Sequence, residues 1–222
     1  MNYMRQLIKF FLILIIILSN NVLFANAAVE GYIDYHLPID YSKLSQEELD
    51  SKAGFYYNLV TKKSNVKLDN DMTTALNLYM ILHRKNPQNN FYTTRLGLLY
   101  DMLNQDKYAR GCFEIAIGVD SSQPEPYYRL GEFYYKRFLY KKAMKNYKLA
   151  YKNGYTQHYD TLYKIGDIYE KFGDTEAAIK YLRMAAKINP NSELDNKMQR
   201  LNQSNQSNKE YYSDTRIRLI DR

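Results

Sequence analysis

Three glycines recur at a nearly constant interval, and each sits in the same local context. Gly97, Gly131 and Gly166 each follow a leucine or isoleucine, and tyrosine, alanine, a large apolar residue and alanine follow at fixed offsets. Glycine inside a helix costs about 1 kcal/mol relative to alanine, so its recurrence predicts a packing requirement. A spacing of 34 and 35 residues predicts supersecondary units that stack on one another.

The matched positions fall in three successive units. They are Leu96, Gly97, Tyr100, Ala109, Phe113 and Ala116; Leu130, Gly131, Tyr134, Ala143, Tyr147 and Ala150; and Ile165, Gly166, Tyr169, Ala178, Leu182, Ala185 and Pro190. This pattern resembles the tetratricopeptide repeat (TPR) family over residues 90–190. The chain departs from the family at the tryptophan position, which holds Thr93, Tyr127 and Leu162, and the closing proline survives only as Pro190.

The resemblance implies an all-α fold, a short right-handed α-solenoid of TPR helix hairpins with a C-terminal capping helix. The repeats are expected at residues 90–123, 124–158 and 159–190. Small residues at the eighth and twentieth positions of a repeat let helix backbones approach closely. We therefore expect Gly131 to pack against Ala143.

The flanks extend this organisation. Residues 45–89 are interpreted as a degenerate TPR-like helix pair that begins with a capping box of Ser45 and Glu48. The insertion SNVKLDND separates its two helices. The remaining predicted segments are an extended linker at 28–44, a capping helix at 191–203 and a flexible tail at 204–222.

The N-terminal residues have the features of a secretory signal peptide, predicted at 1–27. Arg5 and Lys9 precede the apolar run FFLILIIIL, and Ala25-Asn26-Ala27 offers a small-residue cleavage site. The alternative is an uncleaved anchor over residues 7–28. The protein is thus expected to be exported, either periplasmic or secreted after cleavage near Ala27, or held at the membrane by the anchor.

Charge and composition exclude several classes of function. The formal net charge of +7 is modest, and both signs are interspersed, which argues against a nucleic-acid partner. Cys112 is the single cysteine, so an intrachain disulfide or a cysteine-based zinc site is not expected, and the thiol is predicted to be buried.

No motif of the sequence predicts catalysis. His36, His83 and His158 are isolated, and Asp160 near His158 is interpreted as a helix cap or a favourable charge at a helix start. We therefore expect no catalytic residues, no metal site and no cofactor, and a protein that is not an enzyme.

The resemblance also implies a concave groove that binds a partner. TPR proteins concentrate ligand contacts at the second, fifth, ninth, twelfth and thirteenth positions of each repeat. The matching residues are Phe91, Thr94, Leu98, Asp101 and Met102; Glu125, Tyr128, Glu132, Tyr135 and Lys136; and Asp160, Tyr163, Asp167, Glu170 and Lys171. Their tyrosines and carboxylates predict a peptide or helix ligand with basic and aromatic or apolar residues. Thr94 and Leu98 stand where a carboxylate clamp would begin, so capture of a C-terminal carboxylate is not expected.

The resulting hypothesis is a non-enzymatic scaffold or adaptor in the cell envelope. One alternative is a membrane-anchored assembly subunit that keeps its N-terminal helix, and membrane contact is expected only in that case. Another is a regulatory partner of an envelope enzyme such as a cell-wall hydrolase.

The convex side of the repeats is expected to carry lysines that could touch anionic lipid headgroups. These are mainly Lys141, Lys142, Lys145 and Lys148. The oligomeric state stays open.

Overall fold

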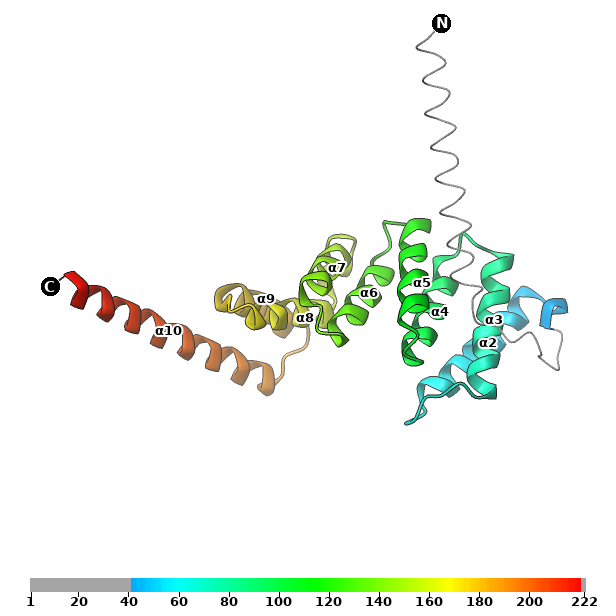
Figure 1. Ribbon diagram of the computed structural model, residues 1–222, viewed down its shortest axis with the longest axis horizontal. Helices are drawn as coiled ribbons and strands as arrows, with labels where there is room; N and C mark the ends of the chain where they lie inside the picture. Colours follow the sequence, from blue (N-terminus) through cyan, green and yellow to red (C-terminus); the bar gives the residue numbers. More distant parts are fainter. Residues whose placement is uncertain (1–40, 221–222) are drawn as a thin grey trace, which may run out of the picture. The chain divides into compact units, whose positions relative to one another are not determined.

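The computed structural model describes residues 41–220, and these form helices and no strand (Figure 1). In chain order the elements are η1 (Tyr41–Lys43), α2 (Gln46–Thr61), α3 (Asn70–Lys85), α4 (Asn90–Met102), α5 (Asp106–Val119), α6 (Pro124–Lys136), α7 (Tyr140–Lys152), η2 (Tyr155–Gln157), α8 (Tyr159–Lys171), α9 (Thr175–Ile188) and α10 (Ser192–Ile220). The predicted all-α fold is confirmed.

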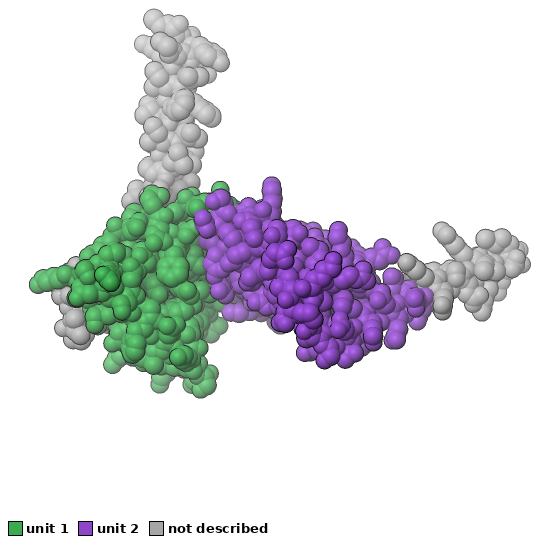
Figure 2. All heavy atoms as spheres, turned by 180° about the vertical axis from the view of Figure 1, so that it is seen from behind, with its two compact units in different colours: residues 1–121 green, residues 122–222 purple. Residues whose placement is uncertain are grey.

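The chain divides into two compact units, residues 1–121 and residues 122–222 (Figure 2). Unit 1 contains the helix pairs α2/α3 and α4/α5, and unit 2 contains α6/α7, α8/α9 and α10. Each residue range expected to hold a repeat therefore contains one pair of helices.

The first pair begins as its sequence predicts. The backbone N–H of Ser45 donates to Glu48 Oε2 at 2.9 Å, and the backbone N–H of Glu48 donates to Ser45 Oγ at 3.3 Å. These two bonds form the predicted capping box, which satisfies N–H groups that the start of a helix leaves unpaired.

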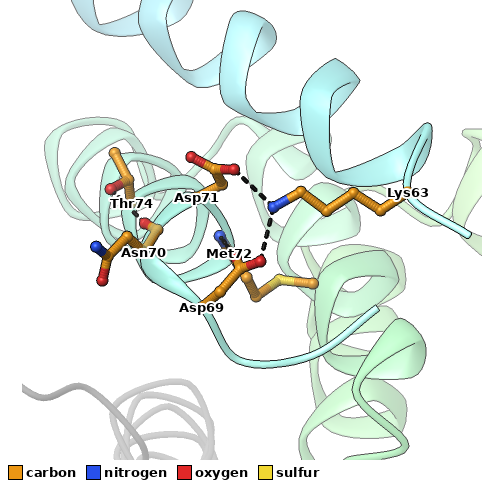
Figure 3. Close-up of polar contacts among 6 residues, drawn as sticks. All are labelled: Lys63, Asp69, Asn70, Asp71, Met72 and Thr74. Atoms are coloured by element: carbon orange, nitrogen blue, oxygen red, sulfur yellow. Dashed lines mark hydrogen bonds and ion pairs between the residues drawn. The ribbon is translucent and has the colours of Figure 1, made fainter. Parts of the chain in front are cut away.

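A lysine closes the insertion between α2 and α3 (Figure 3). Lys63 Nζ lies 2.7 Å from Asp69 Oδ2 and 2.6 Å from Asp71 Oδ2. Asp69 is also the N-cap of α3, since its Oδ1 accepts from the backbone N–H of Met72 at 3.0 Å. One side chain after α2 thus holds the first turn of α3.

The three repeating glycines each lie beneath a large side chain from the following helix. A Cβ atom added to Gly97 would stand 2.7 Å from the Phe113 ring, and one added to Gly131 would stand 2.8 Å from the Tyr147 ring. A Cβ added to Gly166 would stand 2.8 Å from Leu182. The contact that most directly requires Gly131 is therefore with Tyr147, the large residue sixteen positions later.

Most of the residues matched to the repeat pattern are buried. The exceptions are Tyr169, which is half-buried and stacks on Tyr181 with ring centroids 5.6 Å apart, and Pro190, which is exposed just after the end of α9. Proline cannot continue a helix, so an exposed position after α9 suits it.

The C-terminal helix begins as predicted and continues further. Leu194 is buried, and Met198 and Leu201 pack with it against Leu162 and Leu182 of the last helix pair. Residues 204–220, predicted as a flexible tail, continue α10 instead. The segment holds no proline or glycine to end the helix.

The predicted signal peptide, the alternative anchor and the linker up to residue 40 lie outside the described residues. Residues 41–43 of the predicted linker form η1. Among the helices that the structure describes, none is long and apolar enough to cross a membrane.

Candidate partner-binding surface

In unit 1, the residues predicted to contact a partner form an apolar stripe on α4. Phe91 is 46% exposed, and Leu98 and Met102 are half-buried. Their spacing of seven and eleven residues places them on one side of the helix. Thr94 and Asp101 are buried instead, and the Thr94 hydroxyl donates to the Asn90 carbonyl at 2.7 Å.

Helix α2 contributes two apolar residues that were not predicted from the sequence. Phe55 is 63% exposed and Leu59 is exposed one turn later. They correspond in repeat position to Leu98 and Met102, and the signal that could have found them is Gly54, which takes the eighth repeat position as Gly97 does. We call Phe55, Leu59, Phe91, Leu98 and Met102 the apolar face of unit 1.

Polar and stacking contacts join the two helices that carry this face. The Tyr92 hydroxyl of α4 accepts from Gln46 Nε2 at 2.8 Å and donates to Asp50 Oδ2 at 3.1 Å, both on α2. The Arg95 guanidinium carbon lies 4.4 Å from the centre of the Tyr57 ring and 4.8 Å from that of Phe91. Side chains of α2 and α4 therefore meet directly.

In unit 2, tyrosine hydroxyls of the same unit bind the predicted carboxylates. Tyr147 donates to Glu132, and Tyr155 donates to Glu125. Glu125 also accepts from Arg129 Nε at 2.7 Å. Burial, with the charge and hydrogen bond of Glu132, raises the pKa of Tyr147, so this hydroxyl keeps its proton and remains a donor.

Tyr128, predicted to contact a partner, is buried among aromatic rings. Its ring centroid lies 5.9 Å from those of Tyr147 and Tyr155 and 4.8 Å from that of His158. Burial raises its pKa. Tyr128 therefore packs within unit 2.

The carboxylates of α8 bind a lysine of α10. Lys197 Nζ lies 2.9 Å from Asp167 Oδ1 and 2.7 Å from Glu170 Oε2. It also lies 5.2 Å from the centre of the Tyr163 ring. Tyr135 donates a further hydrogen bond to Asp167. A cation of the chain itself thus occupies the acidic tyrosine-rich surface that was predicted for a basic ligand.

In this cluster, the neighbours of Asp167 and Lys197 outweigh the effect of burial on the pKa of each group. Burial alone would raise the pKa of Asp167, but the hydrogen bonds from Tyr135 and Lys197 outweigh it and the pKa is lowered. Burial alone would lower the pKa of Lys197, but bonds to Glu170 and Asp167 raise it. Lys197 was not predicted to contact Asp167 or Glu170, because the predicted contact positions belong only to the three full repeats, which end at residue 190. It takes the fifth position of a unit that continues the same register.

The remaining candidate residues have structural roles. His158 is the N-cap of α8, since its Nδ1 accepts from the backbone N–H of Thr161 at 3.2 Å, and Asp160 lies in the first turn. The Cys112 thiol is buried, as predicted, and burial raises its pKa to about 12. Within residues 41–220 no group of three or more histidine, cysteine or acidic side chains could hold a metal ion.

A cavity of about 430 Å³ lies between α9 and α10, away from the predicted positions. Its lining is mainly charged and polar: Glu176, Ile179, Lys180, Arg183, Met184, Lys187, Asn202 and Asn205.

Comparison with known proteins identifies similar sequences and folds. The family model "Tetratricopeptide repeat" matches residues 159–192. The structure of MamA, residues 41 to the end, from Desulfovibrio magneticus RS-1 is 16% identical over 73% of this chain and 90% of that chain, with a TM-score of 0.54. PilW, a widely conserved type IV pilus biogenesis factor, is 17% identical over 66% of this chain and 64% of that chain, with a TM-score of 0.54.

A third similar structure is that of Naa15/Naa10 bound to HypK-THB, 15% identical over 65% of this chain and 20% of that chain, with a TM-score of 0.53. No curated protein matches the sequence. At these identities the similar structures show the fold. The family model covers the third repeat, and the two preceding repeats carry the same pattern of glycine, tyrosine and alanine, so the chain has the all-α solenoid fold of tetratricopeptide repeats, with the family itself matched at residues 159–192.

Proposed function

We propose that this protein is a non-enzymatic scaffold or adaptor of the cell envelope that binds a peptide or helix of a partner protein. The observation that carries the proposal is the apolar face of unit 1. Helices α2 and α4, whose side chains meet, carry the exposed Phe55, Leu59 and Phe91 and the half-buried Leu98 and Met102. Apolar side chains that gather on a surface in this way mark interaction sites.

The chemistry of this face defines the partner segment. An amphipathic helix that presents apolar residues at intervals of three or four would lay its apolar side on the face. A ligand with basic residues was predicted from carboxylates that in unit 2 accept hydrogen bonds from the chain's own tyrosines and Lys197. The apolar part of the predicted ligand is therefore the part that we retain.

The location in the envelope rests on the N-terminal sequence. A short positive region, an apolar run and a small-residue cleavage site predict export. The partner would then be another exported or membrane protein.

Site-specific photo-cross-linking in the native cells tests this function. A photoreactive amino acid at position 98 or 102 should give an adduct with a partner protein. The same amino acid at position 114 of α5, where Glu114 is exposed, should not. The adduct should be lost when Phe55→Ser and Phe91→Ser are added, because both aromatic anchors are then removed. Equal adducts at position 114, or adducts that survive the double substitution, would contradict the proposal.

A further inference from the structure

The turn between the two helices of a repeat places one residue in the left-handed region. Asn104 has a φ of 57°, Phe138 a φ of 59° and Gly173 a φ of 77°. Each stands seven residues after the repeat glycine. Glycine and asparagine adopt this conformation readily, whereas a residue as bulky as phenylalanine seldom does. Phe138 is therefore a strained residue in a turn that the other repeats build without strain.

Packing within the fold does not explain the choice of phenylalanine. Phe138 is 77% exposed, and its ring meets that of Tyr140 edge-on at a centroid distance of 6.1 Å. Phe138 is unusual in two respects: its backbone has a positive φ, which bulky residues seldom adopt, and its large apolar side chain is exposed. Such positions are where functional constraints are expected.

Phe138 is part of a larger apolar edge. Leu139 follows it and is exposed, and Phe172, at the turn between α8 and α9 of the same unit, is 48% exposed. The Tyr140 ring links the two turns, because it contacts Phe138 and lies 5.4 Å from the Lys171 ammonium. We call Phe138, Leu139 and Phe172 the apolar edge of unit 2.

Lysines follow the apolar edge directly. Helix α7 contains five of them and no acidic residue, and all five are exposed: Lys141, Lys142, Lys145, Lys148 and Lys152. Lys141 and Lys142 stand in the first turn, where the helix dipole disfavours cations. Asp174 is the acidic residue at the neighbouring turn, and its carboxylate already accepts from the backbone N–H of Ala177 at 3.0 Å. An anionic ligand would offset the unfavourable position of the two lysines.

We propose that the apolar edge of unit 2 docks on the surface of an anionic phospholipid bilayer. Phe138, Leu139 and Phe172 would enter the interface between headgroups and acyl chains. The ammonium groups of Lys141, Lys142 and Lys171 would lie at the level of the phosphates.

The chemistry of the edge favours a bilayer over a protein partner. A bilayer offers phosphates and an apolar layer side by side at every point, so an apolar edge followed by lysines needs no preformed pocket in its ligand. The inference goes beyond the scaffold function, because it uses a different surface from the apolar face of unit 1. It also develops the expectation that lysines of α7 touch anionic headgroups, because it adds the apolar residues that would enter the bilayer interface.

Tryptophan fluorescence tests the docking at a single position. The chain contains no tryptophan, so Phe138→Trp introduces a unique fluorophore into the full chain. With vesicles of phosphatidylglycerol and phosphatidylcholine, the emission of the Phe138→Trp variant should shift to shorter wavelength, and lipids brominated on the acyl chains should quench it. Vesicles of phosphatidylcholine alone should have little effect, and about 1 M salt should weaken the response.

Phe55→Trp is the matched control. Phe55 is exposed to a similar degree in unit 1, so the indole of this variant should stay in water with either vesicle. The comparison also separates docking of the edge from any affinity of the N-terminal apolar run for lipid, which acts on both variants alike.

A second variant separates docking from folding. Phe138→Asn places in the turn the residue type that Asn104 already supplies, so thermal stability should be unchanged or higher. Read from the fluorescence of an added Phe172→Trp substitution, its affinity for the anionic vesicles should fall by about tenfold, as expected when one buried phenylalanine is lost.

Three results would overturn the proposal. One is emission of the Phe138→Trp variant that anionic vesicles leave unchanged. Another is equal vesicle affinity with and without Phe138→Asn. The third is a response of the Phe138→Trp variant to polyglutamate but not to vesicles, which would assign the edge to an acidic protein.

Discussion

At Gly131, helix propensity and packing act in opposite directions, and packing is the larger effect. Alanine is favoured over glycine by about 1 kcal/mol in a helix interior. However, an added Cβ would stand 2.8 Å from the Tyr147 ring. That ring is held in place because its hydroxyl donates to Glu132 and its centroid lies 5.9 Å from that of the Tyr128 ring. We expect Gly131→Ala to lower the free energy of unfolding by about 1–3 kcal/mol in urea titrations.

Two other helical glycines provide the control for this substitution. A Cβ added to Gly54 of α2 or Gly118 of α5 would meet nothing within 4 Å. Gly54→Ala and Gly118→Ala should therefore each raise stability by about 0.5–1 kcal/mol. If Gly131→Ala gave the same gain, the contact with Tyr147 would not be the reason for the glycine.

Because His83 is buried, we expect the free energy of unfolding to fall in mild acid. The side chain is 6% exposed, and its Nδ1 lies 2.9 Å from Thr93 Oγ1. Burial, aided by the charge of Arg84, lowers its pKa from the usual 6.5. In the folded chain His83 stays neutral below pH 6.5, whereas in the unfolded chain it takes up a proton. Stability should therefore be complete above about pH 6.5 and fall as the pH decreases from there.

The matched measurement compares the native chain with His83→Gln. The free energy of unfolding, measured from about pH 7.5 to 5, should fall more steeply for the native chain, because glutamine does not titrate. Parallel curves would show that His83 binds its proton equally in both states.

At the scale of helices, the period of the repeat predicted the fold well because it is a local pattern with a physical cause. The glycine context located three helix pairs, and Ser45 with Glu48 located the start of α2. The length of α10 was missed because the prediction treated a polar sequence as a flexible tail. Without a proline or glycine, the sequence contains no signal that would mark the end of the helix.

The partners of the predicted carboxylates could not be predicted in the same way. Tyr135 reaches Asp167 across 32 residues and Tyr147 reaches Glu132 across 15. Such bonds depend on how side chains of separate helices lie against each other, which a position count along single helices does not reveal. The sequence therefore identified acidic positions without showing that they bind the chain's own donors.

We expect the ion pairs of Lys197 with α8 to stabilise the position of α10. It is the cation that meets both Asp167 and Glu170, and its side chain is 16% exposed. Lys197→Met keeps the length of the side chain but leaves the half-buried and buried carboxylates without this partner. We expect a loss of about 1–3 kcal/mol in the free energy of unfolding and faster amide exchange in the first turns of α10. Arg200→Met removes an exposed cation from the same helix and should change neither. If the two variants behaved alike, Leu194, Met198 and Leu201 alone would hold the helix.

For the whole molecule, the two units present different surfaces. Unit 1 carries an apolar face of five residues on α2 and α4, and unit 2 carries an apolar edge followed by a helix rich in lysine. The average charge of the chain conceals this difference, because acidic and basic residues balance over most of the sequence while α7 has lysines alone. One surface suits an amphipathic helix and the other an anionic bilayer, so the two proposals can be tested with separate substitutions.

Processing of the N-terminus is the prediction that decides where these surfaces act. The apolar run from Phe10 to Leu18 is shorter than the roughly 20 residues that span a bilayer, and Ala25-Asn26-Ala27 suits a signal peptidase. Intact-mass spectrometry of the protein from its own cells should therefore show a chain that starts at Ala28. Ala27→Lys should block cleavage and keep the chain of full length in the membrane fraction. A native chain that starts at Met1 and resists extraction at high pH would favour the anchored alternative. If the chain starts at Ala28, the apolar run no longer contributes to lipid binding, and Phe138→Asn should then weaken binding to anionic vesicles by about tenfold.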